Sequence, residues 1–219
     1  LTIPKETGAQ LLEHVILLNK VTINQDSFGE IISLTDSAIL ELRYYRNNIL
    51  HTFILPSLVC RLLERNAKVS QEDLLAQIQR LVQLLKTDLF LWQSDNGVAQ
   101  QVQAVCQFLA DNDIAKQTKA GFWSLSSDDE TRAKIRLMAE CVNETMQRFA
   151  IITSLLSQLA PIKKSELDEK VVAIAQRLSV LNNINAPEFI DKKAQSTLII
   201  AMKDQGYIVL DDDDKANKR

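Results

Sequence analysis

Apolar residues recur at intervals of three and four along most of the chain, and this spacing predicts helices. The predicted helices cover residues 5–20, 36–59, 74–85, 98–111, 127–156, 171–181 and 196–204. At the start of the fifth, Ser127 and Glu130 stand at the spacing of a capping box. Only five glycines and four prolines interrupt 219 residues, which favours helices over sheets joined by tight turns. The sequence therefore predicts a mainly α fold, a multi-helix bundle.

Two segments depart from the helical spacing and predict short hairpins. Residues 21–23 and 28–32 indicate two strands around a turn, and residues 114–116 and 122–125 indicate a second pair directly after a helix. A helix followed by a small hairpin is the outline of a winged helix. We therefore expect a few short strands or hairpins with winged-helix-like substructures in the helical fold.

Residues 43–59, RYYRNNILHTFILPSLV, combine aromatic, basic and amide side chains with an apolar run. Pro56 lacks an amide proton, so the helix is expected to bend or restart there. The polar candidates for a domain interface are Tyr44, Tyr45, Arg46, Asn47, Asn48 and His51. The apolar candidates for membrane contact are Phe53, Ile54, Leu55 and Leu58, with a buried helix as the alternative for the whole stretch.

The run YYRNNILHTFILPSL resembles the region downstream of the catalytic core in bacterial membrane-bound glycerol-3-phosphate acyltransferases. Residues 175–189 and 198–208 resemble the same family, in the same order along the chain. The resemblance implies the C-terminal part of an enzyme that transfers a fatty acyl group from acyl-carrier protein or coenzyme A to glycerol 3-phosphate. Its product, lysophosphatidate, opens phospholipid synthesis, and the implied location is peripheral, at the cytoplasmic face of the inner membrane.

Enzymes of that family carry a histidine followed five positions later by an aspartate, and this chain has no such pair. Asn19 stands five positions after His14, and Pro56 stands five positions after His51. A catalytic histidine needs a partner that fixes its tautomer and orientation. We therefore expect this chain alone to be inactive and to hold no catalytic residue, with both substrates bound by the missing domain.

The resemblance also suggests how the chain is divided. Residues 1–34 are expected to pack with the missing catalytic domain, residues 35–210 to form a helical accessory domain, and residues 211–219 to be a charged, mobile tail. The expected partners are the catalytic domain of the same protein and, as a further candidate, the membrane surface. The longest mainly apolar run, residues 49–60, is too short to span a bilayer.

Composition narrows the alternatives. A net charge of −3 gives no general attraction for nucleic acid, and in the winged-helix-like segment Lys116 and Lys119 are offset by Asp111 and Asp113. Three widely spaced cysteines and two histidines offer no metal-binding spacing, so we expect neither a metal nor a cofactor. The remaining alternative from another class is a free-standing helical module that binds a protein partner.

Overall fold

The computed structural model describes residues 5–89, 91, 94–182, 184, 187–210 and 215–218. The helices are α1 Gly8–Leu17, α2 Asp36–Arg65, α3 Gln71–Leu89, α4 Asp95–Asp111, α5 Asp129–Glu140, α6 Asn143–Leu159, α7 Lys164–Leu181, α8 Pro187–Ile190 and α9 Lys192–Asp204. The strands are β1 Val21–Asp26, β2 Gly29–Leu34, β3 Val69–Ser70, β4 Ala115–Gln117, β5 Phe122–Leu125, β6 Ile162–Lys163, β7 Ile208–Leu210 and β8 Lys215–Lys218. The predicted mainly helical class with a few short strands is confirmed.

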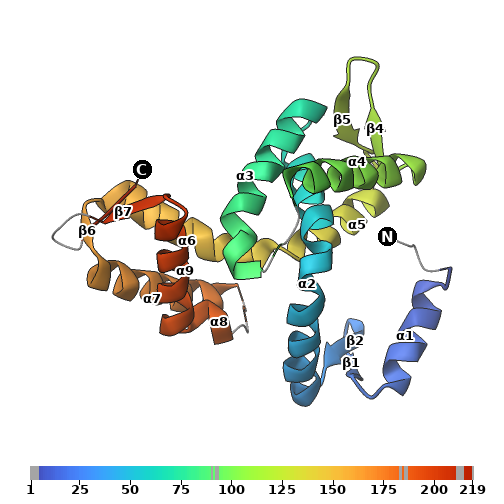
Figure 1. The fold of residues 1–219 in the computed structure, drawn as a ribbon. Helices are drawn as coiled ribbons and strands as arrows, with labels where there is room; N and C mark the ends of the chain where they lie inside the picture. Colours follow the sequence, from blue (N-terminus) through green and yellow to red (C-terminus); the bar gives the residue numbers. More distant parts are fainter. Residues whose placement is uncertain are drawn as a thin grey trace. The chain divides into compact units, whose positions relative to one another are not determined.

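The chain divides into two compact units, and the division falls inside α2 rather than at residue 34. The N-terminal unit is Leu1–Thr52 and the C-terminal unit is Phe53–Arg219. In the N-terminal unit, α1 leads into the antiparallel β1–β2 hairpin, which α2 follows (Figure 1). Thr7 caps α1, because its hydroxyl accepts from the Gln10 amide at 3.3 Å while the Gln10 side chain accepts from the Thr7 amide at 2.8 Å.

The first part of the C-terminal unit has the connectivity of a winged helix. The end of α2 leads through β3 into α3 and α4, and the β4–β5 hairpin follows. The strand order is β3–β5–β4, with both pairs antiparallel. Ser70 caps α3, because its hydroxyl accepts from the Asp73 amide at 3.0 Å. Residues 53–125 are called the first copy below.

The second part repeats this connectivity. Helix α6 leads through β6 into α7, the short α8 and α9, and the β7–β8 hairpin follows, with strand order β6–β8–β7 (Figure 1). Its strand pairs lie 93 residues after those of the first copy: Val69↔Trp123 corresponds to Ile162↔Ala216, and Ala115↔Leu125 corresponds to Ile208↔Lys218. Residues 146–218 are called the second copy below.

The buried positions repeat with the same spacing. The equivalent buried pairs are Leu62 and Leu155, Leu63 and Leu156, Val69 and Ile162, Leu74 and Leu167, Ile78 and Val171, Cys106 and Ile199, and Leu109 and Met202. Three of these seven pairs keep the same residue, and every member is apolar. The C-terminal unit is therefore a tandem duplication of one winged helix, which the sequence patterns suggested only for the first copy.

Two predicted features of the 127–156 helix were wrong. The chain forms two helices there, α5 and α6, which are separated at Cys141 and Val142. No glycine or proline marks this break, so spacing alone does not reveal it. The capping residue is Asp128 rather than Ser127, because its carboxylate accepts from the Thr131 amide at 2.8 Å, and this hydrogen bond lowers the pKa of Asp128.

Helix α2 continues through Pro56, so of the two outcomes expected there the restart does not occur. Within the segment expected to be a charged tail, Lys215–Lys218 form β8 and pair with β6 and β7. Asp211–Asp214, the acidic part of that tail, lie outside the described residues.

Candidate functional site

The predicted interface residues lie on the part of α2 that belongs to the N-terminal unit. Tyr44 is 68% exposed and Tyr45 is 55% exposed, although both have large apolar rings. The two rings touch edge to face, with their centroids 5.9 Å apart and their planes at 73°. Exposed tyrosines of this kind are typical of surfaces that bind another protein surface.

The polar candidates continue the same helix. Arg46 and His51 are half-buried, and both take part in interactions within the chain. Asn48 is exposed, and Asn47 lies in the helix with a side chain outside the described set. Because α2 turns through a full circle every 3.6 residues, these four residues and the tyrosines do not form one narrow face. The arrangement offers hydrogen-bonding groups beside apolar rings and holds no catalytic pair.

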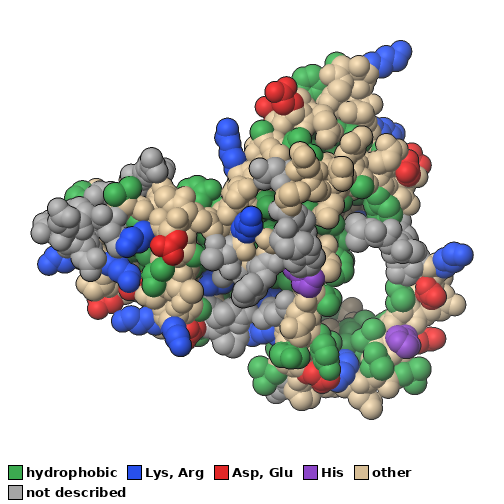
Figure 2. All heavy atoms as spheres, viewed as in Figure 1, with side chains coloured by type: hydrophobic (Ala, Val, Ile, Leu, Met, Phe, Trp, Pro, Cys, Tyr) green, Lys and Arg blue, Asp and Glu red, His purple; other side chains and the backbone are tan. Residues whose placement is uncertain are grey.

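In the described part of the N-terminal unit, most large apolar side chains are exposed to solvent. Among its described residues, only Ala38 and Leu50 are buried hydrophobic side chains, and α1 buries none. The exposed large apolar side chains are Leu11, Leu17, Leu18, Ile23, Phe28, Ile31, Ile32, Leu34, Leu40, Leu42, Tyr44, Tyr45 and Ile49. We call this set the apolar surface of the N-terminal unit, and Figure 2 shows hydrophobic side chains gathered over β1, β2 and the start of α2.

The candidate membrane-contact residues lie in the first copy instead. Ile54, Leu55 and Leu58 are 0%, 4% and 1% exposed, and Phe53 is half-buried. These three buried side chains form core, as in the alternative that the sequence left open, and present no surface to lipid here. In the described part of the chain, no helix is both long and apolar enough to cross a bilayer.

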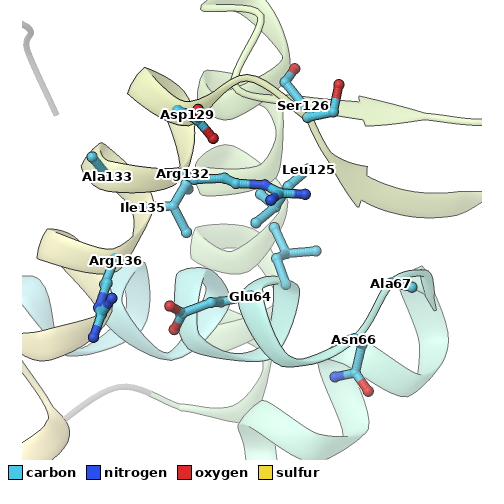
Figure 3. Close-up of a pocket in the computed structure, with 12 residues that line it drawn as sticks. Glu64, Asn66, Ala67, Leu125, Ser126, Asp129, Arg132, Ala133, Ile135 and Arg136 are labelled. Carbon is cyan, nitrogen blue, oxygen red and sulfur yellow. The ribbon is translucent and has the colours of Figure 1, made fainter.

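A pocket of 760 Å³ lies in the C-terminal unit, away from every predicted site residue. Its walls come from the end of α2, the end of β5 and helix α5, with Leu63, Leu125 and Ile135 among the apolar lining residues (Figure 3). Arg132 and Arg136 stand one helical turn apart on α5 and also line it. Two carboxylates, Glu64 and Asp129, line the pocket beside these arginines, and no described contact identifies a ligand.

The sequence analysis missed this pocket because its walls are far apart in the chain. Glu64, which also lines it, is bound by Arg61 at 3.0 Å, and Arg61 lies 3.4 Å from Glu140. The Arg61–Glu140 pair joins α2 to α5. The spacing of Arg132 and Arg136 was the one local signal, and a pair of arginines on an exposed helix is too common to identify a site.

Comparisons with known proteins agree with the resemblance drawn from the sequence. The family described as the glycerol-3-phosphate acyltransferase C-terminal region matches residues 2–211. A glycerol-3-phosphate acyltransferase from Colwellia psychrerythraea is 61% identical over 213 residues, which cover 97% of this chain and 26% of the relative.

More distant relatives match over the same extent. The glycerol-3-phosphate acyltransferase of Aeromonas hydrophila is 37% identical, over 94% of this chain and 25% of the relative. That of Shewanella oneidensis is 36% identical, over 91% of this chain and 24% of the relative. The chain thus spans about a quarter of the length of the curated relatives that it matches, and it belongs to the family of glycerol-3-phosphate acyltransferase C-terminal regions.

Proposed function

We propose that this chain is the non-catalytic C-terminal part of an enzyme that transfers an acyl group to glycerol 3-phosphate. The complete enzyme takes the acyl group from acyl-carrier protein or coenzyme A and releases lysophosphatidate, acting peripherally at the cytoplasmic face of the inner membrane. Family membership supports the reaction, and the quarter-length match supports the division of labour. Neither His14 nor His51 has an aspartate five positions later, so the catalytic pair belongs to the remainder of the protein.

The observation that carries the role is the apolar surface of the N-terminal unit. Phe28 is 97% exposed and Leu17 is 79% exposed. Leaving apolar surface in contact with water costs about 25 cal/mol for each Å², so covering these side chains would be favourable. The matching family is described as a C-terminal region, and the relatives are about four times as long. We therefore assign this surface, with Tyr44, Tyr45, Arg46 and Asn48, to packing against the catalytic part.

The test is a double variant of the full-length enzyme, Tyr44→Ala with Tyr45→Ala. If these rings pack against the catalytic part, the variant loses at least tenfold in acyltransferase activity or detaches from the membrane fraction. The control is Leu137→Ala, because Leu137 is a large apolar side chain of α5 in the C-terminal unit and is 75% exposed. Unchanged activity and unchanged membrane retention in the double variant would remove these residues from the interface.

A simpler measurement separates this proposal from a free-standing interaction module. An antibody raised against this chain should detect a cellular polypeptide roughly four times its mass of 24.7 kDa, since relatives match over only 26% of their length. That polypeptide should sediment with membranes. A soluble band near 25 kDa would instead favour the module.

A further inference from the structure

The N-terminal unit repeats the second half of a winged-helix copy. In all three places a residue with positive φ stands two positions after the end of a helix, and a hairpin follows. The three residues are Asn19 with φ 52°, Asp113 with φ 57° and Gly206 with φ 78°. They are spaced by 94 and 93 residues. In each case the next strand begins two residues later, at Val21, Ala115 and Ile208.

The hydrogen bonds at this corner are also the same. The amides of Asn19, Asp113 and Gly206 each donate to the carbonyl three residues earlier, at 2.9, 3.1 and 2.8 Å. The helix after each of the first two hairpins begins with an equivalent cap. Thr35 accepts from the Ala38 amide at 3.1 Å, and Asp128, 93 residues later, accepts from the Thr131 amide at 2.8 Å. These agreements extend the repeat to α1, β1 and β2.

The N-terminal unit differs from the first copy in how deeply the equivalent helix side chains are buried. Val105 and Leu109 on α4 are 9% and 4% exposed, because the first copy also supplies α3 and the end of α2. Their equivalents on α1, 94 residues earlier, are Leu11, which is 41% exposed, and Val15, which is half-buried. The part of the fold that covers these positions is absent from the described N-terminal unit.

The sheet shows the same omission. In the first copy β5 pairs with both β4 and β3, and in the second copy β8 pairs with both β7 and β6. Its equivalent, β2, pairs with β1 alone in the described residues, which leaves one strand edge open. An open, largely apolar edge is a template for a further strand. In both complete copies that strand is two residues long and lies between the first two helices.

We propose that the polypeptide immediately preceding Leu1 in the full-length protein completes a third winged helix around α1, β1 and β2. This segment supplies a helix, a two-residue strand that pairs antiparallel with β2, and a second helix that covers Leu11 and Val15. Its length corresponds to residues 146–187 of the second copy, because Leu1 is equivalent to residue 188 at the spacings given above. The proposal rests on the proposed function in one respect, namely that the protein continues upstream of this chain.

The test is hydrogen exchange on three proteins: this chain, this chain extended upstream by a segment of that length, and the full-length enzyme. The amides on the outer edge of β2 are expected to exchange at least tenfold more slowly in the extended chain than in this chain. The full-length enzyme should then add little further protection. Equal exchange in this chain and the extended chain would overturn the proposal.

Paired variants in the full-length enzyme give a second readout. Val15→Ala should accelerate exchange of β1 and β2 at least tenfold, because its equivalent Leu109 is core. Glu13→Ala is the matched control, because Glu13 is exposed and its equivalent, Gln107, is also exposed. Equal effects of the two variants would contradict a winged-helix arrangement around α1.

The outcomes distinguish this proposal from the proposed function. If β2 is protected in the full-length enzyme but not in the extended chain, another part of the protein covers it. The third winged helix is then excluded, and packing of the N-terminal unit on the remainder still stands. If β2 is open in all three proteins, both packing ideas fail, and the Tyr44 and Tyr45 variants then decide whether this surface affects acyl transfer at all.

Discussion

The two winged-helix copies share one backbone plan but fill equivalent core positions with different chemistry. Leu55 and Val102 of the first copy are 4% and 0% exposed, and their equivalents in the second copy are Arg148 and Gln195, at 6% and 0%. Arg148 donates from Nη2 to the Ala194 carbonyl at 3.4 Å. The Gln195 side-chain amide donates to the Phe189 carbonyl at 2.6 Å.

At these positions the first copy depends on apolar packing, whereas the second copy also depends on hydrogen bonds from buried polar side chains. A buried polar group is stable only where hydrogen bonds replace those it made with water. In the second copy the Arg148 bond joins α6 to Ala194 on α9, and the Gln195 bond joins α9 to the carbonyl of Phe189 on α8. In the first copy apolar side chains hold these two places, so packing takes the part of the two hydrogen bonds.

Exchanging the core residues Leu55 and Arg148 between the copies should give the largest change in the free energy of unfolding. Leu55→Arg places a charge in the first copy at a site built from apolar neighbours, so it should destabilise that copy by more than about 4 kcal/mol. Both tryptophans of the chain, Trp92 and Trp123, fall in the first copy, so tryptophan fluorescence during urea unfolding reports it selectively.

The reciprocal variant is the control for this exchange. Arg148→Leu removes a charged group from the second copy along with its hydrogen bond to Ala194, and should cost about 1–3 kcal/mol. A larger loss for Arg148→Leu than for Leu55→Arg would reverse the comparison. Far-ultraviolet circular dichroism, which reports both copies, gives this second value.

Truncating the equivalent core leucines of the two copies should give the next largest loss of stability. Leu74 and Leu167 are both 0% exposed at matching positions of α3 and α7, so each change to alanine should cost about 2–5 kcal/mol. If the copies unfold separately, only Leu74→Ala moves the fluorescence midpoint. Equal midpoint shifts for the two variants would mean that the copies unfold together, as one cooperative unit.

A smaller effect is expected at the corner before each hairpin. Gly206 holds φ 78° in the second copy, where Asp113 holds φ 57° in the first. A side chain in this left-handed conformation costs about 1–2 kcal/mol, so Gly206→Ala should lower the thermal midpoint of the chain. Asp113→Gly should change it little or raise it. A stabilised Gly206→Ala protein would show that this corner relaxes freely.

The smallest effect at neutral pH concerns the thiols of the first copy. Burial raises the pKa of Cys60 to about 12 and the pKa of Cys106 to about 11, from an ordinary value of 9.0. Above about pH 9 the unfolded chain therefore releases protons that the folded chain retains, so stability falls as pH rises from about 9 to 12 and is unaffected below.

Measurements on both copies and on the thiols themselves check this prediction. The second copy has Thr153 and Ile199 at these positions, so only the fluorescence-reported unfolding should become easier with alkali. A thiol reagent at pH 8 should label the exposed Cys141 rapidly and leave the buried Cys60 and Cys106 unreacted in the folded protein. Equal labelling of all three would contradict the burial.

The elements that could be predicted are those with a local signal. The spacing of Leu74, Ile78 and Val82 predicted α3 because a buried helical stripe is visible in the sequence. The β1–β2 and β4–β5 hairpins were confirmed for the same reason, since the chain changes its spacing there. Strands β3, β6 and β8 were not predicted, because strands this short depend on partners tens of residues away.

The candidate site could likewise be predicted only as far as its signal is local in the sequence. The exposed rings of Tyr44 and Tyr45 and the burial of Leu58 lie only a few turns apart on α2, and a helical pattern cannot decide which part of an apolar run is covered. The duplication was hidden because the equivalent positions keep apolar character rather than identity. Leu74 and Leu167 are the same residue, but Val102 and Gln195 are not even in the same class.

The identical strand register of the two copies also bears on how the chain assembles during synthesis. The β4–β5 hairpin is geometrically able to pair with β6, since β6 presents the same two-residue edge as β3. Trp123 opposes this exchange, because its ring nitrogen donates to Gln71 at 2.5 Å in its own copy, whereas Lys164 holds the equivalent position in the other. Lysine offers no acceptor, so the wrong hairpin would leave the indole donor unsatisfied. The difference between Gln71 and Lys164 thus disfavours pairing of the β4–β5 hairpin with the strand of the other copy.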